Sequence, residues 1–375
     1  MKLCVFPNDP IGDYYEKGYL KERYFNPGNF FTKVHIISPT DNDISEDLIK
    51  NIVGSADLKI HSVGKNTVFN IKKKKDDILQ LVDSINSDVI RAYNPLAQGW
   101  LAAYCSDKLK IPFYLSLHSQ YDGHRKLMKK KKFKRYLALK YSRKFIEPFV
   151  LSKANKITGV YKIIDKYVED LSGKHPEIIY NKINLNQFKN AKKILNFDKP
   201  LILSVGRLSS EKNHSVLIQA IKNLDLFLII IGNGELEPYL KELVKKLNIE
   251  YKVIFKKSIP NSEIQNYYKS ADLFVLPYDP EIEGIPIAVL ESIASGLPTI
   301  VPFPVKEYSD GLENSVEFSK MDVNSLSEKI KTIISDKEYL KKLSENALKK
   351  SKEFDENISE MKEVENYRKL LGMEN

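Results

Sequence analysis

The feature that most constrains this chain is an alternation of short apolar runs with amphipathic stretches, which runs through its first half and starts again after Asn190. Short apolar runs bounded by turn residues predict buried β-strands, and apolar residues recurring every three or four positions predict helices. In the first half the predicted strands are 3–6, 34–38, 89–92, 111–117 and 156–160, and the predicted helices are 76–85, 96–108 and 163–171. This alternation favours a mainly parallel sheet covered by helices.

The second half repeats the pattern with strands that are short and apolar, as parallel strands buried on both faces should be. The predicted strands are 201–205, 226–231, 252–255 and 273–276, and the predicted helices are 213–223, 235–247, 261–269 and 287–294. A chain of 375 residues is long enough for two domains, each with its own core. We therefore predict an α/β protein with two doubly wound domains, 1–190 and 191–355. A helical tail follows, and its last segment, 356–375, is predicted to return to the first domain.

Composition and the first residues limit the class of protein further. The chain is 42% hydrophobic and 29% charged, which is typical of a folded soluble protein. It opens directly into an apolar strand without the features of a signal peptide, and no apolar run approaches about 18 residues. No His/Asp cluster has metal-ligand spacing. We expect a cytoplasmic protein that holds neither a metal nor a bound cofactor.

Two cations follow the first strand of the second half. Ligands bind beyond the carboxyl ends of the strands in doubly wound sheets, so the residues just after each strand matter most. Arg207 comes directly after Gly206, and Lys212 precedes the next helix. Two cations beside a helix N-terminus suit a diphosphate, although the pair alone is also typical of a solvated loop.

Two carboxylates follow the strand 273–276. Glu283 lies in the loop, Glu291 lies in the helix, and Gly284 with Ile285 stands between them. Glu291 is flanked by apolar residues, so an unpartnered carboxylate there would cost free energy. Ribose hydroxyls could be its partner, and a nearby Lys is the structural alternative.

Gly232 and Gly234 follow the strand ending at Ile231 and begin like a dinucleotide-binding fingerprint. Glu237 stands where the third glycine belongs, and its charge would oppose a pyrophosphate. The glycines are therefore predicted to make a tight turn near a nucleotide rather than an NAD site. The loop around Ile259 lies where a nucleotide base could rest.

Taken in order, these motifs resemble the large retaining glycosyltransferase family of GT-B fold numbered four (GT4, glycosyl transferases group 1). The resemblance rests on Gly206-Arg207 with Lys212, on Gly232-x-Gly234, on Glu283 and Glu291 separated by seven residues, and on 295–298; segment 179–188 resembles the end of the family's first domain. The chain departs from the family at Lys182, where glycine is usual, at Tyr161, where serine is usual, and in an N-terminal loop without paired glycines. The resemblance implies two Rossmann-like domains facing across a cleft.

The resemblance also implies residue roles. Arg207 and Lys212 would bind the donor diphosphate, Glu291 the ribose, and Glu283 with the following amides the transferred sugar and the phosphates. His118, which follows the strand 111–117, matches the family's histidine near the anomeric centre. The implied reaction moves a sugar from a nucleotide-diphosphate sugar to a hydroxyl of a glycan or lipid-linked acceptor, with retention and without a metal. A GT-B-fold epimerase or phosphorylase is the alternative.

A basic stretch lies in the predicted acceptor-side domain. Between Gly123 and Ile146 the chain is rich in Lys and Arg and has no acidic residue, and apolar residues are interleaved with the cations. A basic amphipathic helix of this kind favours contact with the anionic cytoplasmic face of a membrane or with the acceptor. The alternatives are a solvated helix face and binding of nucleic acid. The cations predicted to make the contact are Lys129, Lys130, Lys131, Lys132, Lys134 and Arg135.

Overall fold

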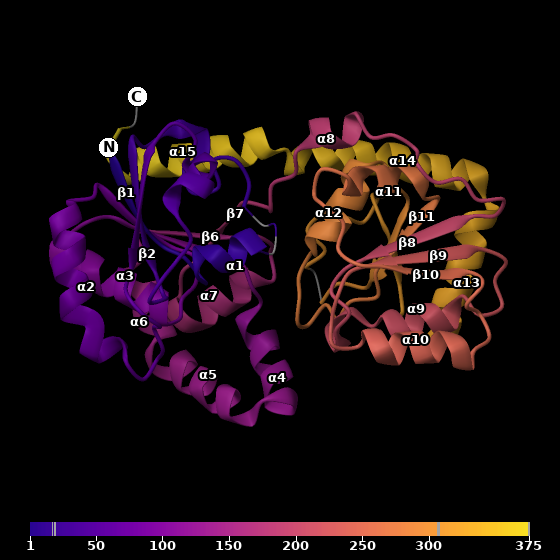
Figure 1. Ribbon diagram of the computed structural model, residues 1–375, viewed down its shortest axis with the longest axis horizontal. Helices are drawn as coiled ribbons and strands as arrows, with labels where there is room; N and C mark the ends of the chain where they lie inside the picture. Colours follow the sequence, from indigo (N-terminus) through magenta and orange to yellow (C-terminus); the bar gives the residue numbers. More distant parts are fainter. Residues whose placement is uncertain (17, 19, 306–307, 374–375) are drawn as a thin grey trace. The chain divides into compact units, whose positions relative to one another are not determined.

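The computed structural model describes residues 1–16, 18, 20–305 and 308–373. The chain divides into two compact units (Figure 1). Unit 1 comprises Met1–Tyr180 and Asn357–Asn375, and unit 2 comprises Asn181–Glu356.

Unit 1 is built on a parallel sheet of seven strands, counted over its described residues, in the order β3-β2-β1-β4-β5-β6-β7. Buried side chains of β1 and β2 pack with Phe25, Phe31 and Tyr367 in one hydrophobic core. The strands are β1 (Lys2–Phe6), β2 (Lys33–Ser38), β3 (Asp57–Ser62), β4 (Val89–Ala92), β5 (Phe113–Leu117), β6 (Lys156–Gly159) and β7 (Glu177–Ile178). The helices are α1 (Ile11–Glu16), α2 (Ile71–Ile85), α3 (Ala97–Leu109), α4 (Tyr121–Lys131), α5 (Phe133–Phe145), α6 (Glu147–Lys153), α7 (Ile164–Ser172) and, at the end of the chain, α15 (Glu356–Leu370).

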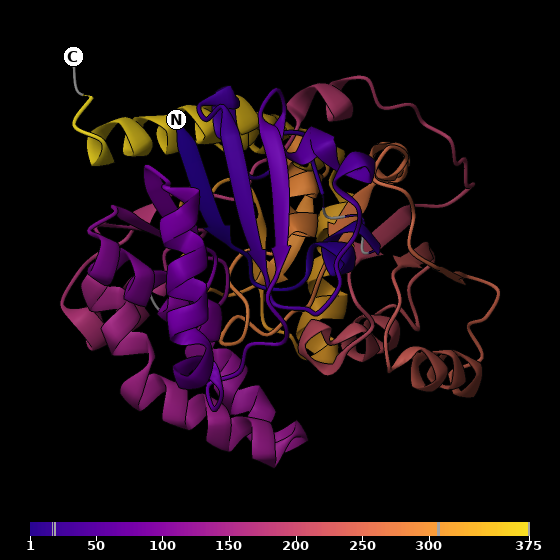
Figure 2. The same ribbon diagram turned by 60° about the vertical axis from the view of Figure 1, so that its left-hand side comes forward.

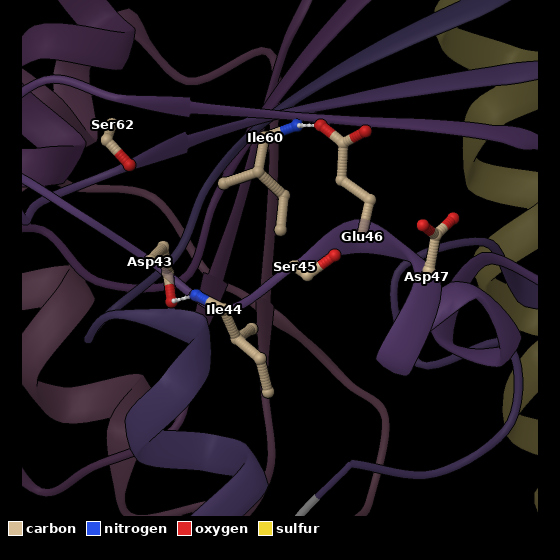
Figure 3. A pocket seen from close by; sticks show the side chains of 7 residues that line it. All are labelled: Asp43, Ile44, Ser45, Glu46, Asp47, Ile60 and Ser62. Carbon is tan, nitrogen blue, oxygen red and sulfur yellow. Dashed lines mark hydrogen bonds between the residues drawn. The ribbon is translucent and has the colours of Figure 1, made fainter.

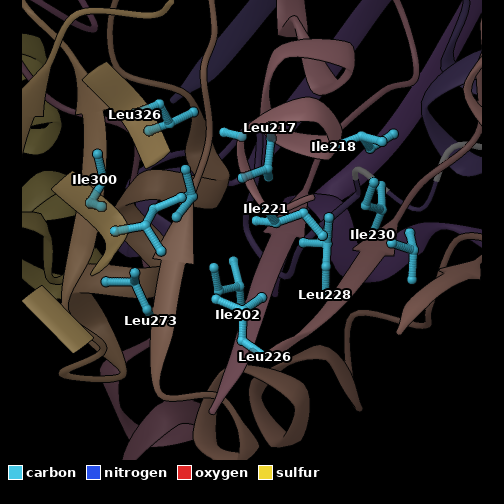
Figure 4. Packing of buried hydrophobic residues seen from close by; sticks show 14 of the residues in the cluster. Ile202, Leu217, Ile218, Ile221, Leu226, Leu228, Ile230, Leu273, Ile300 and Leu326 are labelled. Atoms are coloured by element: carbon cyan, nitrogen blue, oxygen red, sulfur yellow. The ribbon is translucent and has the colours of Figure 1, made fainter. Parts of the chain in front are cut away.

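Unit 2 repeats the plan with six parallel strands among its described residues, in the order β10-β9-β8-β11-β12-β13. Apolar residues of the strands pack against α9 and α13 in a core that includes Ile202, Leu228, Leu217 and Leu326 (Figure 4). The strands are β8 (Leu201–Val205), β9 (Phe227–Ile231), β10 (Val253–Lys256), β11 (Leu273–Val275), β12 (Thr299–Pro302) and β13 (Glu317–Ser319). The helices are α8 (Leu185–Lys189), α9 (His214–Ala220), α10 (Glu237–Lys246), α11 (Ile264–Ser270), α12 (Ile287–Ala294), α13 (Val323–Ser335) and α14 (Lys337–Ser351).

Both units confirm the predicted α/β class with doubly wound, parallel sheets and a helical C-terminal region. In unit 2 the chain runs from β8 outward to β9 and β10 and then returns to place β11 on the other side of β8. The strand order therefore reverses beside β8, and ligands of doubly wound sheets bind at such a reversal. The loops after β8 and β11 carry the charged residues that the sequence singled out.

The connecting segment 181–190, placed in the first domain by the sequence analysis, is part of unit 2. Helix α8 packs against α11 and α12. The Gln187 side-chain amide donates a hydrogen bond of 3.0 Å to Gln265 Oε1, and Ile183 forms a β-bridge with Asp355. These contacts attach the segment to unit 2.

Helix α15 is fixed to unit 1 by a buried arginine. Arg91 of β4 is 2% exposed and donates hydrogen bonds to Tyr367 Oη at 2.7 Å, to Ser116 Oγ at 3.0 Å and to the Glu363 carboxylate. Its guanidinium also lies 4.7 Å from the ring centre of Tyr114. A buried charge is tolerated only with partners of this kind, so the network specifies where α15 docks.

The basic stretch was predicted as one helix and is two, so this expectation is corrected. Helices α4 and α5 are separated by Lys132, whose φ of −148° and ψ of 79° are not helical. The break falls within the run of lysines, where like charges three or four positions apart destabilise a continuous helix. In the described residues, no helix combines the length and the apolar character that crossing a membrane requires.

Candidate functional site

The loops after β8 and β9 lie in direct backbone contact. Leu208 N donates to Asn233 O at 2.9 Å, and Leu236 N donates to Leu208 O at 2.9 Å. A Cβ on Gly232 would lie 2.0 Å from Gly206 O, and one on Gly234 would lie 2.2 Å from Leu208 O. Both glycines are therefore required by the close approach of two backbones. This requirement fixes the loop that carries Arg207 and Lys212.

Lys212 and Glu283 come together although they lie far apart in the sequence. The backbone amide of Asp279, in the loop after β11, donates to Glu211 O at 2.8 Å and joins this loop to the one after β8. Lys212 Nζ then lies 2.5 Å from Glu283 Oε2. The lysine side chain is 8% exposed and the glutamate side chain 33%. A shielded cation with one carboxylate partner thus stands at the edge of the sheet where β8 and β11 end.

Arg207, the second predicted cation, has a different environment. Its side chain is 70% exposed, and its guanidinium lies 3.8 Å from Glu211 Oε1. Surface ion pairs contribute little to stability. Because its side chain is mostly exposed, the Arg207 guanidinium is accessible to a ligand. Lys212, in contrast, already has a short contact with the Glu283 carboxylate. A Cβ on Gly206, which precedes Arg207, would make only ordinary contacts of 3.6 Å.

Glu291 has a tyrosine as its partner, and sequence reasoning considered only a ribose or a lysine. The buried Tyr268 hydroxyl of α11 lies 2.9 Å from Glu291 Oε2, to which it donates, and 3.1 Å from Ala288 O. Burial, followed by the negative charge of Glu291, raises the pKa of Tyr268 well above its usual value. The tyrosine therefore stays protonated as a donor. An aromatic residue late in a predicted helix gave no signal for this role.

The segment between the two glutamates leads into α12. Pro286 occupies the N-cap with φ −60° and ψ 145°, and Gly284 and Ile285 precede it. The first amides of a helix have no partner within the helix, so this end of α12 can bind an anion. The loop after β10 lies beside the loop after β9, because Asn233 Nδ2 donates to Ser258 Oγ at 3.3 Å. Ile259 follows in that loop and is half-buried.

His118 belongs to unit 1, whereas the predicted donor-binding residues belong to unit 2. It follows β5 and is exposed, and its ring centre lies 5.4 Å from that of Tyr93 at an angle of 31°. Tyr93 itself is buried. The carboxyl end of β5 thus presents the imidazole at the edge where doubly wound sheets bind ligands.

His214, the first residue of α9, was not singled out by the sequence. It is 2% exposed, and neither ring nitrogen has a hydrogen-bond partner in the described part of the chain. Burial, together with the nearby charge of Lys212, lowers the pKa of His214 to about 3. Ser204 and Ser209 of the same region also have buried hydroxyls without partners there. The one feature of the sequence that could have drawn attention to His214 is its position two residues after Lys212.

The predicted membrane-side cations all lie on or between α4 and α5. Lys129, Lys131, Lys132, Lys134 and Arg135 are exposed. The side chain of Lys130 lies outside the described parts of the structure.

A shallow pocket of about 240 Å³ in unit 1 contains none of the predicted site residues (Figure 3). Asp43, which lines it, accepts hydrogen bonds from the amides of Ile11 at 2.8 Å, Gly12 at 2.7 Å and Ile44 at 2.8 Å. Glu46 accepts one from the amide of Ile60 at 2.7 Å. These carboxylates hold the loops of unit 1 in place, and the Gly12 amide is already paired. Among the described residues, no group of three or more His, Cys, Asp or Glu is placed to hold a metal ion.

Comparison with known proteins finds a family that matches much of unit 2. The family model described as glycosyl transferases group 1 matches residues 186–350. An uncharacterised glycosyltransferase of Methanocaldococcus jannaschii is 28% identical over 278 residues, which cover 73% of each chain. The alpha-monoglucosyldiacylglycerol synthase of Streptococcus pneumoniae is 27% identical over 265 residues, which are 65% of this chain and 59% of that protein. The chain thus spans less than two thirds of the second relative.

A solved structure extends the likeness to the whole chain at the level of the fold. HepE of Anabaena in complex with UDP superposes with a TM-score of 0.74 at 15% identity, over 98% of this chain and all of that one. At that identity the likeness concerns the fold alone.

Proposed function

This chain is a glycosyltransferase of the GT-B fold whose second unit is a glycosyl transferases group 1 domain, and from that premise we propose which reaction it catalyses. It moves a sugar from a nucleotide-diphosphate sugar to a hydroxyl of a glycan or lipid-linked acceptor, and the anomeric configuration is retained. It acts without a metal or a bound cofactor. It works in the cytoplasm, where an acceptor can be reached at the membrane face.

The observation that carries the proposal is the contact of 2.5 Å between Lys212 and Glu283. Without a donor, the carboxylate compensates the shielded ammonium group. In the proposed complex the diphosphate takes up the positive charge of Lys212 and of the exposed Arg207, and Glu283 is released to accept hydrogen bonds from sugar hydroxyls. The same three charged side chains, Lys212, Arg207 and Glu283, thus have partners both without and with a bound donor.

The same charges account for catalysis. When the bond from the anomeric carbon to the diphosphate breaks, negative charge grows on the leaving phosphate. Groups already fixed around that phosphate stabilise the transition state more than the bound donor. In the proposal Lys212 and Arg207 supply these cations, and the amides of Gly284 and Ile285, in the loop that leads into α12, add donors. They take the place that a metal ion has in other transferases.

The remaining contacts follow from the loops of unit 2. Glu291, oriented by Tyr268, accepts hydrogen bonds from the ribose hydroxyls, and the loop at Ile259 contacts the base. Gly232 and Gly234 keep the loop after β9 close enough to the loop after β8 to complete the site. His118 of unit 1 is proposed to lie near the anomeric carbon, where the acceptor hydroxyl attacks.

A lipid-linked acceptor is supported by the Streptococcus pneumoniae relative, whose name describes synthesis of a diacylglycerol glycolipid. That support comes from 27% identity over part of each chain. The basic helices α4 and α5 of unit 1 support it independently, because their charge suits an acceptor that is anionic or lies in an anionic surface.

The test is transfer of a labelled sugar by the full chain with Lys212→Met, Arg207→Ala and a control, Lys222→Ala. Lys222 is exposed and follows α9 in the same unit. Loss of one fixed donor to a developing charge lowers kcat by about 100-fold or more, so both site variants should fall by at least that factor and the control should not. Near-normal transfer by both site variants, with folding intact, would contradict the assignment.

Two further measurements separate the proposed reaction from its alternatives. A screen of UDP-, GDP-, ADP- and CMP-sugars by thermal shift should find one nucleotide that raises the melting temperature, because a ligand of the folded state stabilises it by mass action. NMR of the product should show the donor's anomeric configuration. An epimerised sugar nucleotide formed without acceptor, or a sugar phosphate formed from inorganic phosphate, would instead identify an epimerase or a phosphorylase.

A further inference from the structure

Helix α5 exposes a row of large apolar side chains. Phe133, Leu137, Tyr141 and Phe145 follow one another at intervals of four residues, and each is between 38% and 59% exposed. We call these four residues the apolar stripe. Four-residue spacing places them along one side of the helix over a length of about 18 Å. Phe69, which is also exposed, extends the stripe beside Tyr141, with ring centres 6.4 Å apart.

The opposite side of α5 is held to the unit by a network of ion pairs. Arg143 of α5 donates to Asp122 of α4 at 2.8 Å. Arg125 of α4 donates to the same Asp122 at 2.7 Å and to the fully buried Glu147 of α6 at 2.9 Å. The nearest acidic residues on either side of the basic stretch are thus engaged by arginines. The two helices lie side by side at one edge of unit 1 (Figures 1 and 2), with their orientation fixed by this network.

Cations surround the stripe. Lys134, Lys140 and Lys144 lie on the same helix, are exposed and form no ion pair among the described residues. The Lys144 ammonium lies 5.2 Å from the ring centre of Phe145. Lysines next to apolar side chains can extend their charged ends toward a polar layer while the stems cover apolar surface.

We propose that α5 lies on an anionic phospholipid bilayer, with the apolar stripe inserted between the headgroups and the lysines paired with lipid phosphates. A large exposed apolar patch in a folded protein marks an interaction surface. The absence of acidic residues between Gly123 and Ile146 makes the patch complementary to a surface of negative charge. A helix whose exposed side combines large apolar residues with neighbouring lysines is typical of interfacial helices.

This inference deepens the proposed function, because the same unit carries His118 and would meet a lipid-linked acceptor where α5 rests. Its test requires no sugar donor. Binding to vesicles without sugar transfer would support the lipid contact and contradict the proposed reaction, and transfer without binding to vesicles would do the reverse.

The first experiment measures sedimentation of the full chain with vesicles of phosphatidylcholine and phosphatidylglycerol (7:3) and with phosphatidylcholine alone. The variant Lys140→Glu/Lys144→Glu is compared with Lys341→Glu/Lys342→Glu, which makes the same charge change at exposed positions of α14. Each cation lost from an anionic surface weakens binding about fivefold, so the α5 variant should bind about 25-fold more weakly or worse, and the α14 control about as well as the wild type. Equal binding by the two variants, or no binding to the anionic vesicles by the wild type, would overturn the proposal.

The second experiment tests insertion. Leu137→Gln/Phe145→Gln is compared with Ile358→Gln/Met361→Gln, an exposed apolar pair on α15. The stripe variant should lose binding by about tenfold or more because apolar burial drives interfacial binding, and the α15 pair should not. Unchanged binding by the stripe variant would show that nothing inserts. The competing explanation is that α5 binds nucleic acid, since bases can stack on aromatic side chains. A gel shift with single-stranded RNA tests it. Binding to RNA that is tighter than binding to vesicles, and that is lost in the same variants, would also overturn the proposal.

Discussion

Replacing His214 by leucine should stabilise the protein, and the gain should grow as the pH falls. The imidazole is buried at the start of α9, and its two nitrogens have no hydrogen-bond partner among the described residues. An unpaired buried polar group costs about 1–3 kcal/mol, and an apolar group of similar size removes that cost. Leucine fills a comparable volume and places no polar atom in the core.

The pH dependence follows from the pKa of His214, which burial and then the charge of Lys212 lower from 6.5 to about 3. Between these two values the unfolded chain binds a proton that the folded chain does not, so the free energy of unfolding falls as the pH falls. Each pH unit in this window costs about 1.36 kcal/mol. At pH 5 the wild type should therefore have lost about 2 kcal/mol through this one residue. Above pH 6.5 the contribution is constant.

Thermal melting of the full chain at pH 7.5 and pH 5 by circular dichroism measures the effect. One kcal/mol shifts the melting temperature of a domain of this size by about 2–4 °C. His214→Leu should thus melt several degrees above the wild type at pH 7.5, and the gap should widen by about 4–8 °C at pH 5. His175→Leu, which replaces an exposed histidine, is the control. Gaps that stay equal at the two pH values, or a variant that melts below the wild type at both, would refute the reasoning, and NMR titration of the imidazole would show whether its pKa is the error.

Two further substitutions test other contacts. Tyr268→Phe removes the donor to the Glu291 carboxylate, so KM for the donor should rise by about three- to tenfold because a hydrogen bond to a charged group is lost. The preference for a ribose over a 2′-deoxyribose nucleotide sugar should also fall. If the ratio of kcat/KM for the ribose donor to kcat/KM for the 2′-deoxyribose donor is unchanged, Tyr268 does not contribute to ribose recognition. Glu363→Gln leaves the buried Arg91 without its carboxylate, which costs about 3–5 kcal/mol, and should lower the melting temperature and expose α15 to protease. Glu365→Gln on the surface of the same helix should do neither, and equal behaviour of the two variants would show that the buried pair does not hold α15.

Sequence periodicity identified the strands that are buried on both faces, because a short, continuous apolar run between turn residues is typical of a central parallel strand. It missed β3, whose residues Asp57–Ser62 alternate in polarity at the edge of the sheet and are mostly exposed or half-buried. It also missed β12, a strand of four residues that directly follows the segment 295–298. Pairing with a neighbour defines both strands, and a single sequence does not contain that information.

The candidate site was predictable to the extent that strand ends fix it. Arg207, Lys212 and Glu283 could be named because the carboxyl ends of parallel strands share one edge of a sheet. The contact between Lys212 and Glu283 could not be named, since it depends on the path of two loops. Tyr268 and His214 were missed because their importance comes from burial and from which polar group each one faces.

The two units differ in how far geometry constrains their chemistry. In unit 2 the loops after β8, β9, β10 and β11 are tied together by backbone hydrogen bonds, glycine contacts and one ion pair, so the positions of the charged side chains depend on the sheet itself. In unit 1 the amides of Ile11 and Gly12, at the start of α1, are occupied by the Asp43 carboxylate. A donor site built from sheet geometry tolerates little change. We therefore expect surfaces of unit 1, the basic helices α4 and α5 among them, to select the acceptor, and exchanging these two helices between relatives should change the acceptor without changing the nucleotide.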